Sequence, residues 1–199
     1  AGLGAAEYVK GLTSRPQISE ADVDKAAVLA LAPFGDPAAE GAENPYTLHT
    51  DLQQAMNDLV GIIRKEEEVE QALVKLNELK ERFKHVAVEG HRQFNPGWHL
   101  AIDMRNMLLV SECVAKAALL RTESRGGHTR DDHPDMDATW RKTLLVCSTT
   151  GGDPAVPDVL VTPEPQLPLR PDLLELFEIG ELEKYFTPEE LAEHPGRKS

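Results

Sequence analysis

Aromatic residues are scarce in this sequence, cysteines number only two, and long apolar runs are absent. Phe, Trp and Tyr make up 5% of the 199 residues while aliphatic residues are plentiful, and this balance favours a helical protein over a β-sandwich. No apolar run approaches the roughly 20 residues needed to span a bilayer. Cys113 and Cys147 are too few for a disulfide framework, so the sequence indicates a reducing, cytoplasmic environment.

Basic residues are also few relative to acidic ones. The chain carries 21 Lys and Arg against 34 Asp and Glu, which gives a formal net charge of -13. A nucleic-acid-binding protein needs a basic face, and so does a protein that adsorbs to anionic lipid. The sequence therefore predicts no nucleic-acid partner. Its length fits one domain, or one domain with an appended arm.

Motifs for nucleotide, metal and nucleophilic chemistry are missing as well. Neither a Walker loop nor a complete Rossmann fingerprint is present, and "AGLGAA" at the start is too short to count as one. No CxxC or HExxH occurs, and His128 and His133 alone do not make a zinc site. Ser124 lies near His128 without a nucleophile-elbow pattern, while Cys113 and Cys147 are interpreted as core residues. We expect no catalytic, cofactor-binding or metal residue in this chain.

What the sequence does contain is helical periodicity in residues 45–121. Apolar residues recur there at spacings of three and four, and charged residues occupy the other faces. The three stripes comprise Leu48, Leu52, Met56, Leu59 and Ile63; Val69, Leu73, Leu76, Leu79 and Phe83; and Trp98, Ile102, Leu109, Cys113 and Leu120. Ala55 and Ile62 widen the first stripe, and Leu108, Ala117 and Leu119 widen the third. Short connections make sequential helices antiparallel. The predicted fold is mainly α, an elongated antiparallel three-helix bundle of the spectrin-repeat kind.

Residues 1–44 and 122–199 differ from this bundle in character. The first segment reads as the end of a helix, a short helix that begins after Ser19, and a proline- and glycine-rich linker. Because the opening helix has no capping residue before it, we expect the chain to be an excised piece of a longer protein. In the second segment, "TLLVCS" and "DVLVTPEP" predict a small β-hairpin, followed by an irregular, acidic, proline-rich arm with a short helix at "TPEELAE".

The densest polar stretch is "RTESRGGHTRDDHP", residues 121–134. It clusters arginines with carboxylates, a combination that forms bidentate ion pairs and either holds an anionic substrate or docks one surface on another. Docking is favoured because no acid/base pair with a supporting scaffold is identifiable. Gly126 and Gly127 permit a tight turn, so we expect Arg125 and Arg130 to point away from the bundle as anchors. The candidate docking residues are Arg121, Glu123, Arg125, His128, Arg130 and Asp132.

The same stretch resembles the ESRGAHxRxDxP motif of succinate dehydrogenase and fumarate reductase flavoprotein subunits. Gly127 stands where alanine is more usual, and His133 where an aromatic residue is commoner. "NPGWHLAIDMRNMLLVSECVAKAALLR", "WRKTLLV", "LQQAM" and "VGIIRKEEEVEQALVKLNELKER" are similar to neighbouring parts of the family, and "AGLGAAEYVKGL" to the end of its flavin-domain helix. The matching motif positions are Glu123, Ser124, Arg125, Gly126, His128, Arg130, Asp132 and Pro134.

The resemblance implies a helical carboxyl-terminal domain whose parent oxidises succinate, or reduces fumarate, through FAD. It implies as partners the flavin-binding and capping domains of the parent chain, an iron–sulfur subunit and, indirectly, a membrane anchor. The parent complex would be peripheral on the cytoplasmic face of the membrane. The family's flavin and dicarboxylate residues would precede Ala1, so none is carried over and this chain alone is expected to be inactive. Two alternatives stay open: a free-standing helical interaction module, and the corresponding domain of an L-aspartate oxidase-like flavoprotein.

Overall fold

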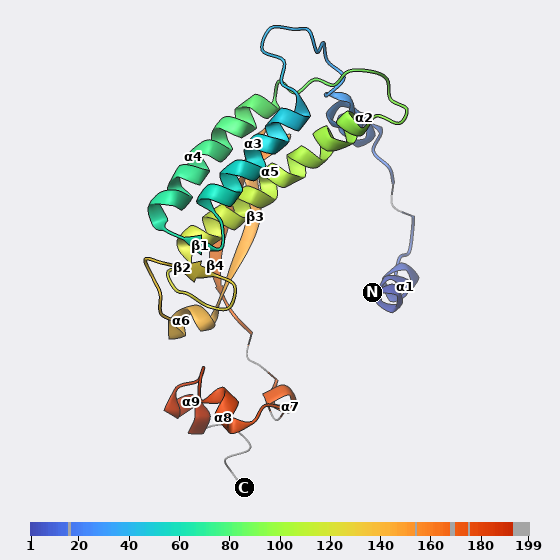
Figure 1. The fold of residues 1–199 in the computed structure, drawn as a ribbon. Coiled ribbons are helices and arrows are strands. Elements are labelled where there is room, and N and C mark those ends of the chain that lie inside the picture. Colours follow the sequence, from blue (N-terminus) through green and yellow to red (C-terminus); the bar gives the residue numbers. More distant parts are fainter. Residues whose placement is uncertain (16, 154, 168–169, 175, 193–199) are drawn as a thin grey trace.

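The structure, a computed structural model, describes residues 1–199 except 16, 154, 168–169, 175 and 193–199. The last residue of the predicted "TPEELAE" helix therefore lies outside the described part. Three long helices form the body (Figure 1): α3 (Pro45–Leu59), α4 (Glu66–Phe83) and α5 (Pro96–Leu120). Each of these helices packs on the other two, which confirms the predicted three-helix bundle.

Capping residues explain where two of the helices begin. The Asn44 side chain accepts a hydrogen bond from the Tyr46 backbone N–H, and Pro45 occupies the first helical turn of α3. Asn95 accepts from the Trp98 N–H in the same way at the start of α5, followed by Pro96. Each of these helices begins with an Asn-Pro pair. Asparagine satisfies a free backbone N–H of the first turn, and proline has no N–H that would need a partner there, so both pairs favour a helix start.

The core between the helices is aliphatic. Leu48 and Leu52 of α3 meet Leu76 and Leu79 of α4, and all four side chains are at most 3% exposed. The α5 side of the core consists of Ala101, Met104, Leu108 and Ala115. Small side chains at two of these positions let the helices approach closely, which suits the narrow spacing of a bundle.

Two predicted stripes need correction. Ile62 and Ile63 lie beyond α3, which ends at Leu59, and they are 81% and 63% exposed; Ile63 belongs to the short strand β1 (Ile63–Arg64). The predicted stripe of α5 is wrong in part: Leu108 is buried as expected, but Ile102 and Leu120 are exposed, and the buried Met104 was not predicted. Apolar residues occur on more than one side of α5, so periodicity alone did not identify the core side.

The predicted β-hairpin is confirmed and lies against the bundle. Strand β3 (Thr143–Asp153) pairs antiparallel with β4 (Val156–Pro165), and β4 packs on α5. Two lysines fix it there: the Lys80 ammonium donates to the Pro157 carbonyl at 3.1 Å and the Lys116 ammonium to the Val159 carbonyl at 2.7 Å. Both lysines are ion-paired with the buried Glu112 carboxylate, so a charged cluster positions the hairpin.

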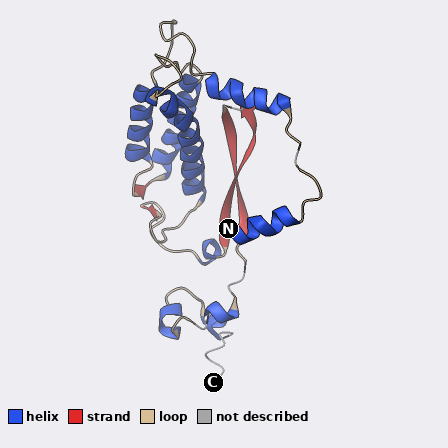
Figure 2. Ribbon diagram, turned by 90° about the vertical axis from the view of Figure 1, so that its right-hand side faces the viewer, coloured by secondary structure: helices blue, strands red, loops and turns tan. Residues whose placement is uncertain are grey.

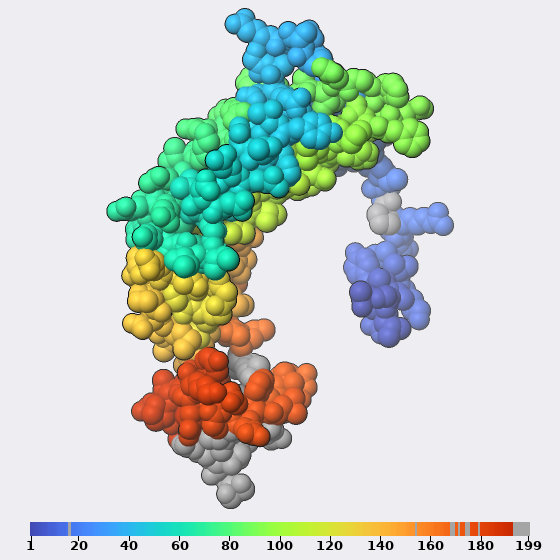
Figure 3. Space-filling model, in the orientation of Figure 1, coloured from blue at the N-terminus to red at the C-terminus, as the bar shows by residue number. Residues whose placement is uncertain are grey.

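The two amino-terminal helices, α1 (Gly2–Lys10) and α2 (Glu20–Leu31), form a strap beside the body (Figure 2). Neither helix has a buried residue. As predicted, Ser19 caps α2 by accepting from the Asp22 N–H. The end of α2 is attached to the body by Trp98, whose indole N–H donates to the Ala30 carbonyl at 2.7 Å and whose ring packs on Phe34. The space-filling view shows a crescent outline, with α1 standing apart from the hairpin (Figure 3).

The carboxyl-terminal arm is less irregular than predicted, since its described residues include three short helices: α7 (Pro171–Leu174), α8 (Ile179–Leu182) and α9 (Pro188–Ala192). Thr187 caps α9 through its hydroxyl, which accepts from the Glu190 N–H. The Glu190 carboxylate also pairs with Arg141 in the short helix α6 (Ala138–Arg141). Among the described residues, no helix is both long and apolar enough to cross a membrane.

Candidate functional site

Arg130, one of the predicted docking anchors, is fully buried at the end of α5. Its Nη1 donates to the carbonyl oxygens of Ala118 at 2.8 Å and Leu119 at 2.9 Å. The last carbonyls of a helix have no partner within the helix, and this end carries partial negative charge. The guanidinium of Arg130 therefore serves as the carboxyl-terminal cap of α5.

The other side of the Arg130 guanidinium binds Asp132. Nε and Nη2 donate to the two carboxylate oxygens at 2.7 Å each, a bidentate pair that holds the pKa of Asp132 far below its ordinary value. Asp132 also accepts from the Glu66 backbone N–H at 3.0 Å, at the first residue of α4. Lys65, the residue before α4, makes no side-chain cap, so Asp132 supplies the cap from a distant segment.

A short parallel pairing places these residues. Strand β1 pairs with β2 (Thr129–Arg130), with Arg64 opposite Arg130. The Asp131 N–H donates to the Arg64 carbonyl at 2.9 Å and continues the pairing. The segment 121–134 thus joins the end of α5 to the start of α4.

Glu123 is the second charged centre of the segment, and its side chain is 0% exposed. It accepts from Arg121 Nη1 at 2.6 Å, from Arg125 Nε and Nη2 at 3.0 and 2.9 Å, and from the Asp137 N–H at 2.9 Å. Burial by itself raises the pKa of Glu123, but the hydrogen bonds from Arg125, Asp137 and Arg121 outweigh it and bring the pKa down to about 2. Glu123 is ionised at neutral pH and holds both arginines.

His128 is neutral in this arrangement. Its Nδ1 is 3.1 Å from Arg64 Nη1 and accepts from it, because a guanidinium has no acceptor; its Nε2 then donates to the Arg121 carbonyl at 3.1 Å. Burial lowers the pKa of His128, and the charges of Arg64, Arg121 and Arg130 lower it further; the hydrogen bond to the Arg121 carbonyl opposes this shift only in part. The ring is therefore a second cap for the end of α5.

Ser124 and the glycine pair shape the loop. The Ser124 hydroxyl accepts from the Arg130 N–H at 2.8 Å and donates to the His133 carbonyl at 2.8 Å, so it is occupied in holding the loop. Arg125 and His128 exchange backbone hydrogen bonds around Gly126, whose φ of 59° lies in the left-handed region that favours glycine. The predicted tight turn is present.

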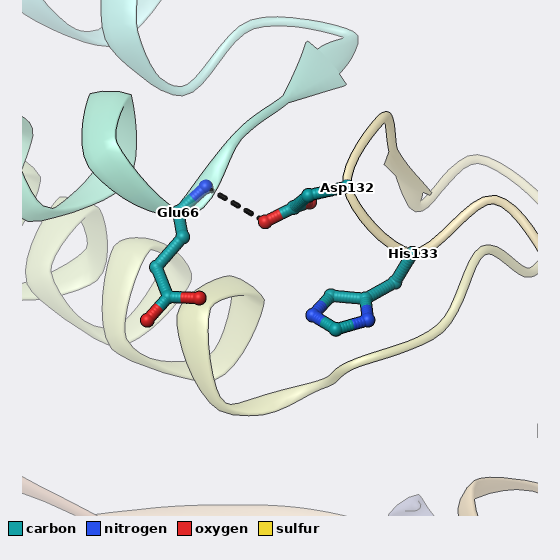
Figure 4. Close-up of side chains that lie close together, drawn as sticks. All are labelled: Glu66, Asp132 and His133. Carbon is teal, nitrogen blue, oxygen red and sulfur yellow. Dashed lines mark hydrogen bonds between the residues drawn. The ribbon is translucent and has the colours of Figure 1, made fainter.

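A possible metal cluster lies at the edge of the segment (Figure 4). One ligand atom each from Glu66, Asp132 and His133 lies within 4.8 Å of the others. Both Asp132 oxygens already accept from Arg130, and a second Arg130 contact reaches Glu66 at 3.9 Å. The fixed guanidinium charge repels a cation at this point, so the cluster is better explained as part of the ion-pair network.

The structure corrects the predicted orientation of the anchors. Arg130 points into the domain, because the unpaired carbonyls of α5 and the Asp132 carboxylate bind its donors. Arg125 also turns inward to Glu123 and to the Asp137 carbonyl at 3.0 Å, and its side chain keeps 26% exposure. Arg121 bridges to the Thr143 carbonyl at 2.9 Å and covers the Trp140 ring. The ion pairs with local acids are present, and each joins a fully buried side chain, Glu123 or Arg130, to a partner that is 19–28% exposed.

Some participants were not predicted. Arg64, Asp137 and Trp140 all contribute to the network, and Cys147, expected in the core, is exposed. The Asp-Ala-Thr-Trp sequence does carry one signal for its part, since Asp137 caps α6 through the Thr139 and Trp140 N–H groups. Nothing in the sequence alone links Arg64 to this loop.

Comparison with known proteins identifies the family. Residues 49–169 match the family described as "Fumarate reductase flavoprotein C-term". The flavoprotein subunit of Coxiella burnetii succinate dehydrogenase is 33% identical over 143 residues, 71% of this chain and 24% of that subunit. The fumarate reductase flavoprotein subunit of Helicobacter pylori strain J99 is 38% identical over 99 residues, 49% of this chain and 14% of that subunit.

A solved structure, the Mycobacterium smegmatis Sdh1 complex in the apo form, contains a chain that is 67% identical with a TM-score of 0.89. The match covers 98% of this chain and 32% of that one. The present chain thus spans about a quarter or less of these two curated relatives, and a third of the mycobacterial chain. It belongs to the succinate dehydrogenase and fumarate reductase flavoprotein family, as the carboxyl-terminal domain of that subunit.

Proposed function

We propose that this chain is a non-catalytic scaffold within a flavoprotein that interconverts succinate and fumarate through FAD and delivers electrons to an iron–sulfur subunit. The names of its relatives support the parent activity. The scaffold role is supported by the hydrogen bonds of the polar groups in residues 121–134, which are made to other parts of the same domain. Glu123 accepts from Arg121, while Arg130 and His128 donate to carbonyls at the end of α5. Asp132 accepts from the first N–H of α4.

FAD does not fit the described part of this chain. A dinucleotide needs a parallel βαβ unit with a glycine-rich turn at a helix amino terminus. The sheets described here are a two-residue parallel pair and an antiparallel hairpin. Gly2 and Gly4 lie inside α1, and a Cβ at either would meet nothing within 4 Å, so neither glycine makes room for a close ligand. The flavin therefore belongs to the rest of the parent chain in this proposal.

The outer hairpin face, which we define as Leu144, Val146 and Leu160, is the proposed contact with the flavin-binding part. These side chains are 47%, 39% and 49% exposed on the face opposite the buried Val159. A strand pair that is apolar on both faces normally has both covered. Helix α1 of the strap carries further exposed apolar residues, among them Leu3 and Tyr8. The ribbon of α1 lies on the side of the hairpin away from the bundle (Figure 2).

We propose the remaining partners from the names of the relatives and from the exposed groups of this chain. We propose that the half-buried Arg121 and Arg125, at the edge of the segment 121–134, contact a neighbouring domain or subunit. Glu123 and Arg130 are buried, so they support this contact only by holding the segment in place. In the parent complex an iron–sulfur subunit and a membrane anchor would complete the assembly, placed on the cytoplasmic face of the membrane.

The test compares this chain with a full-length flavoprotein that contains it. Both proteins are purified, and bound flavin and succinate-dependent dye reduction are measured for each. We expect flavin and turnover in the longer protein and neither in this chain. If this chain retains flavin or reduces dye with succinate, the scaffold proposal is wrong. If the longer protein carries flavin but has no activity with succinate or fumarate, the proposed parent reaction is wrong.

A further inference from the structure

Cys113 and Cys147 lie on facing surfaces of α5 and the hairpin. Cys113 lies between Glu112 and Lys116, the two α5 residues whose charged groups belong to the cluster that holds β4. Residues three positions apart on a helix are neighbours on its surface, so Cys113 lies on the same side as Lys116, whose ammonium reaches the Val159 carbonyl of the hairpin. It is half-buried, as expected for a side chain under a two-stranded sheet.

The hairpin register places Cys147 on the face that looks back at α5. Cys147 is paired with Val161, two residues beyond the buried Val159 in β4. Side chains two apart on a strand, and those directly opposite each other in a pair, lie on the same face of the sheet. Strand β3 also packs on α5 directly. Burial raises the pKa of the Cys113 thiol, and a hydrogen bond with the Cys147 thiol raises it further, as expected for neighbouring thiols.

We propose that Cys113 and Cys147 are a modification site, and that a hydroperoxide converts them to an intrachain disulfide that fastens β3 to α5. Cys147 is exposed and meets the oxidant first. Its thiolate attacks one peroxide oxygen, the O–O bond breaks, and the hydroxide leaves as water after taking a proton; Cys147 becomes a sulfenic acid. The Cys113 sulfur then attacks the Cys147 sulfur, the S–O bond breaks, and a second water leaves. The two thiols lose two electrons in all, which reduce one peroxide to two waters.

The bond would act on the hairpin's position. Without the disulfide, the lysine cluster holds the hairpin through β4, by hydrogen bonds to the Pro157 and Val159 carbonyls. A covalent link from β3 would hold the other strand too. It would also close a chain loop of some thirty residues, which lowers the conformational freedom of the unfolded chain.

The experiment is mild oxidation of the dilute chain with hydrogen peroxide, followed by alkylation with N-ethylmaleimide and intact-mass measurement. Before oxidation we expect two alkyl groups per chain. After oxidation we expect none, a monomer on a non-reducing gel, a mass lower by two hydrogens, and a higher melting temperature that dithiothreitol reverses. Peptide mapping without reduction should recover Cys113 joined to Cys147.

The matched control moves one cysteine and keeps the composition. Ser111 lines the groove toward α3 with Leu52 and Met56, on another side of α5. The double variant Cys113→Ser, Ser111→Cys should therefore keep two alkylatable thiols after the same treatment. Two free thiols in the oxidised wild type, dimers only, or equal oxidation of the control variant would each overturn the proposal.

Discussion

Replacing Glu123 by glutamine removes the charge that holds Arg121 and Arg125 while preserving the shape of the side chain. Glu123 is 0% exposed, and its carboxylate accepts from both guanidiniums and from the Asp137 N–H. The amide of glutamine keeps one acceptor oxygen and turns two donors toward the arginines. We therefore expect Glu123→Gln to destabilise the chain strongly.

The magnitude follows from the pKa of Glu123, which is about 2 in the folded chain against an ordinary 4.5. At about 1.4 kcal/mol per pH unit, this difference corresponds to about 3 kcal/mol of stability at neutral pH. Removing one partner of a buried ion pair costs about 3–5 kcal/mol in general. The two estimates agree, so a loss of about 3 kcal/mol is expected.

The sign of the pH dependence is fixed by the same shift. Because the folded pKa is lower than the unfolded one, Glu123 contributes fully above about pH 4.5. As the pH falls from there toward about 2, the unfolded chain takes up a proton that the folded chain does not, and the contribution disappears. The difference in stability between wild type and Glu123→Gln should therefore shrink over this range.

Urea unfolding followed by circular dichroism, at several pH values, measures this difference. The control is Glu67→Gln on the exposed side of α4, which should change the free energy of unfolding by less than about 0.5 kcal/mol. Equal free energies of unfolding for Glu123→Gln and Glu67→Gln at neutral pH would refute the claim that the buried Glu123 carboxylate stabilises the chain. A difference that stays constant down to the acid end would refute the assigned pKa.

Further expectations concern the core, the hairpin clamp and the histidine cap. Leu76→Ala, at a side chain 1% exposed, should cost about 2–5 kcal/mol in urea melts, while Glu67→Ala stays within about 0.5 kcal/mol. Lys80→Ala leaves the buried Glu112 with one cation and should cost about 3–5 kcal/mol; no effect would show that the cluster does not position the hairpin. Burial lowers the pKa of His128, so stability should fall as the pH drops below about 6.5, and a melting-temperature series of His128→Gln should lack that part of the decline.

The sequence predicted where the helices and strands lie better than it predicted which side of each one is buried. The stripes of α3 and α4 are largely correct, because each helix has one apolar side and a charged back. For α5 the prediction is wrong in part, because this helix is covered on two sides, by the bundle and by the hairpin. Leu108 was placed correctly in the core, whereas Met104 was missed. Hydrophobic periodicity identifies a single buried side and fails where two exist.

For the charged residues of the segment 121–134, too, the sequence predicted the pairing but not the burial. The arginine–carboxylate pairing was predictable, since those groups pair wherever they cluster. Their burial was not, because it depends on the carbonyls of Ala118 and Leu119 and on the Glu66 N–H, which tertiary structure brings together. Two charged residues of this loop, Glu123 and Arg130, are consequently buried, whereas the apolar residues of the outer hairpin face are exposed.

The most direct test of the scaffold account is the affinity of this chain for the flavin-binding part of its parent, expressed separately. We predict a stable complex that Leu160→Lys weakens about ten- to a hundredfold, because about 1.5–3 kcal/mol accompanies the burial of a leucine side chain. Val74→Lys, at an apolar residue of α4 that is 61% exposed, should leave the affinity unchanged. Calorimetric titration that gives equal affinities for both variants, or no complex with the wild-type chain, would contradict the account.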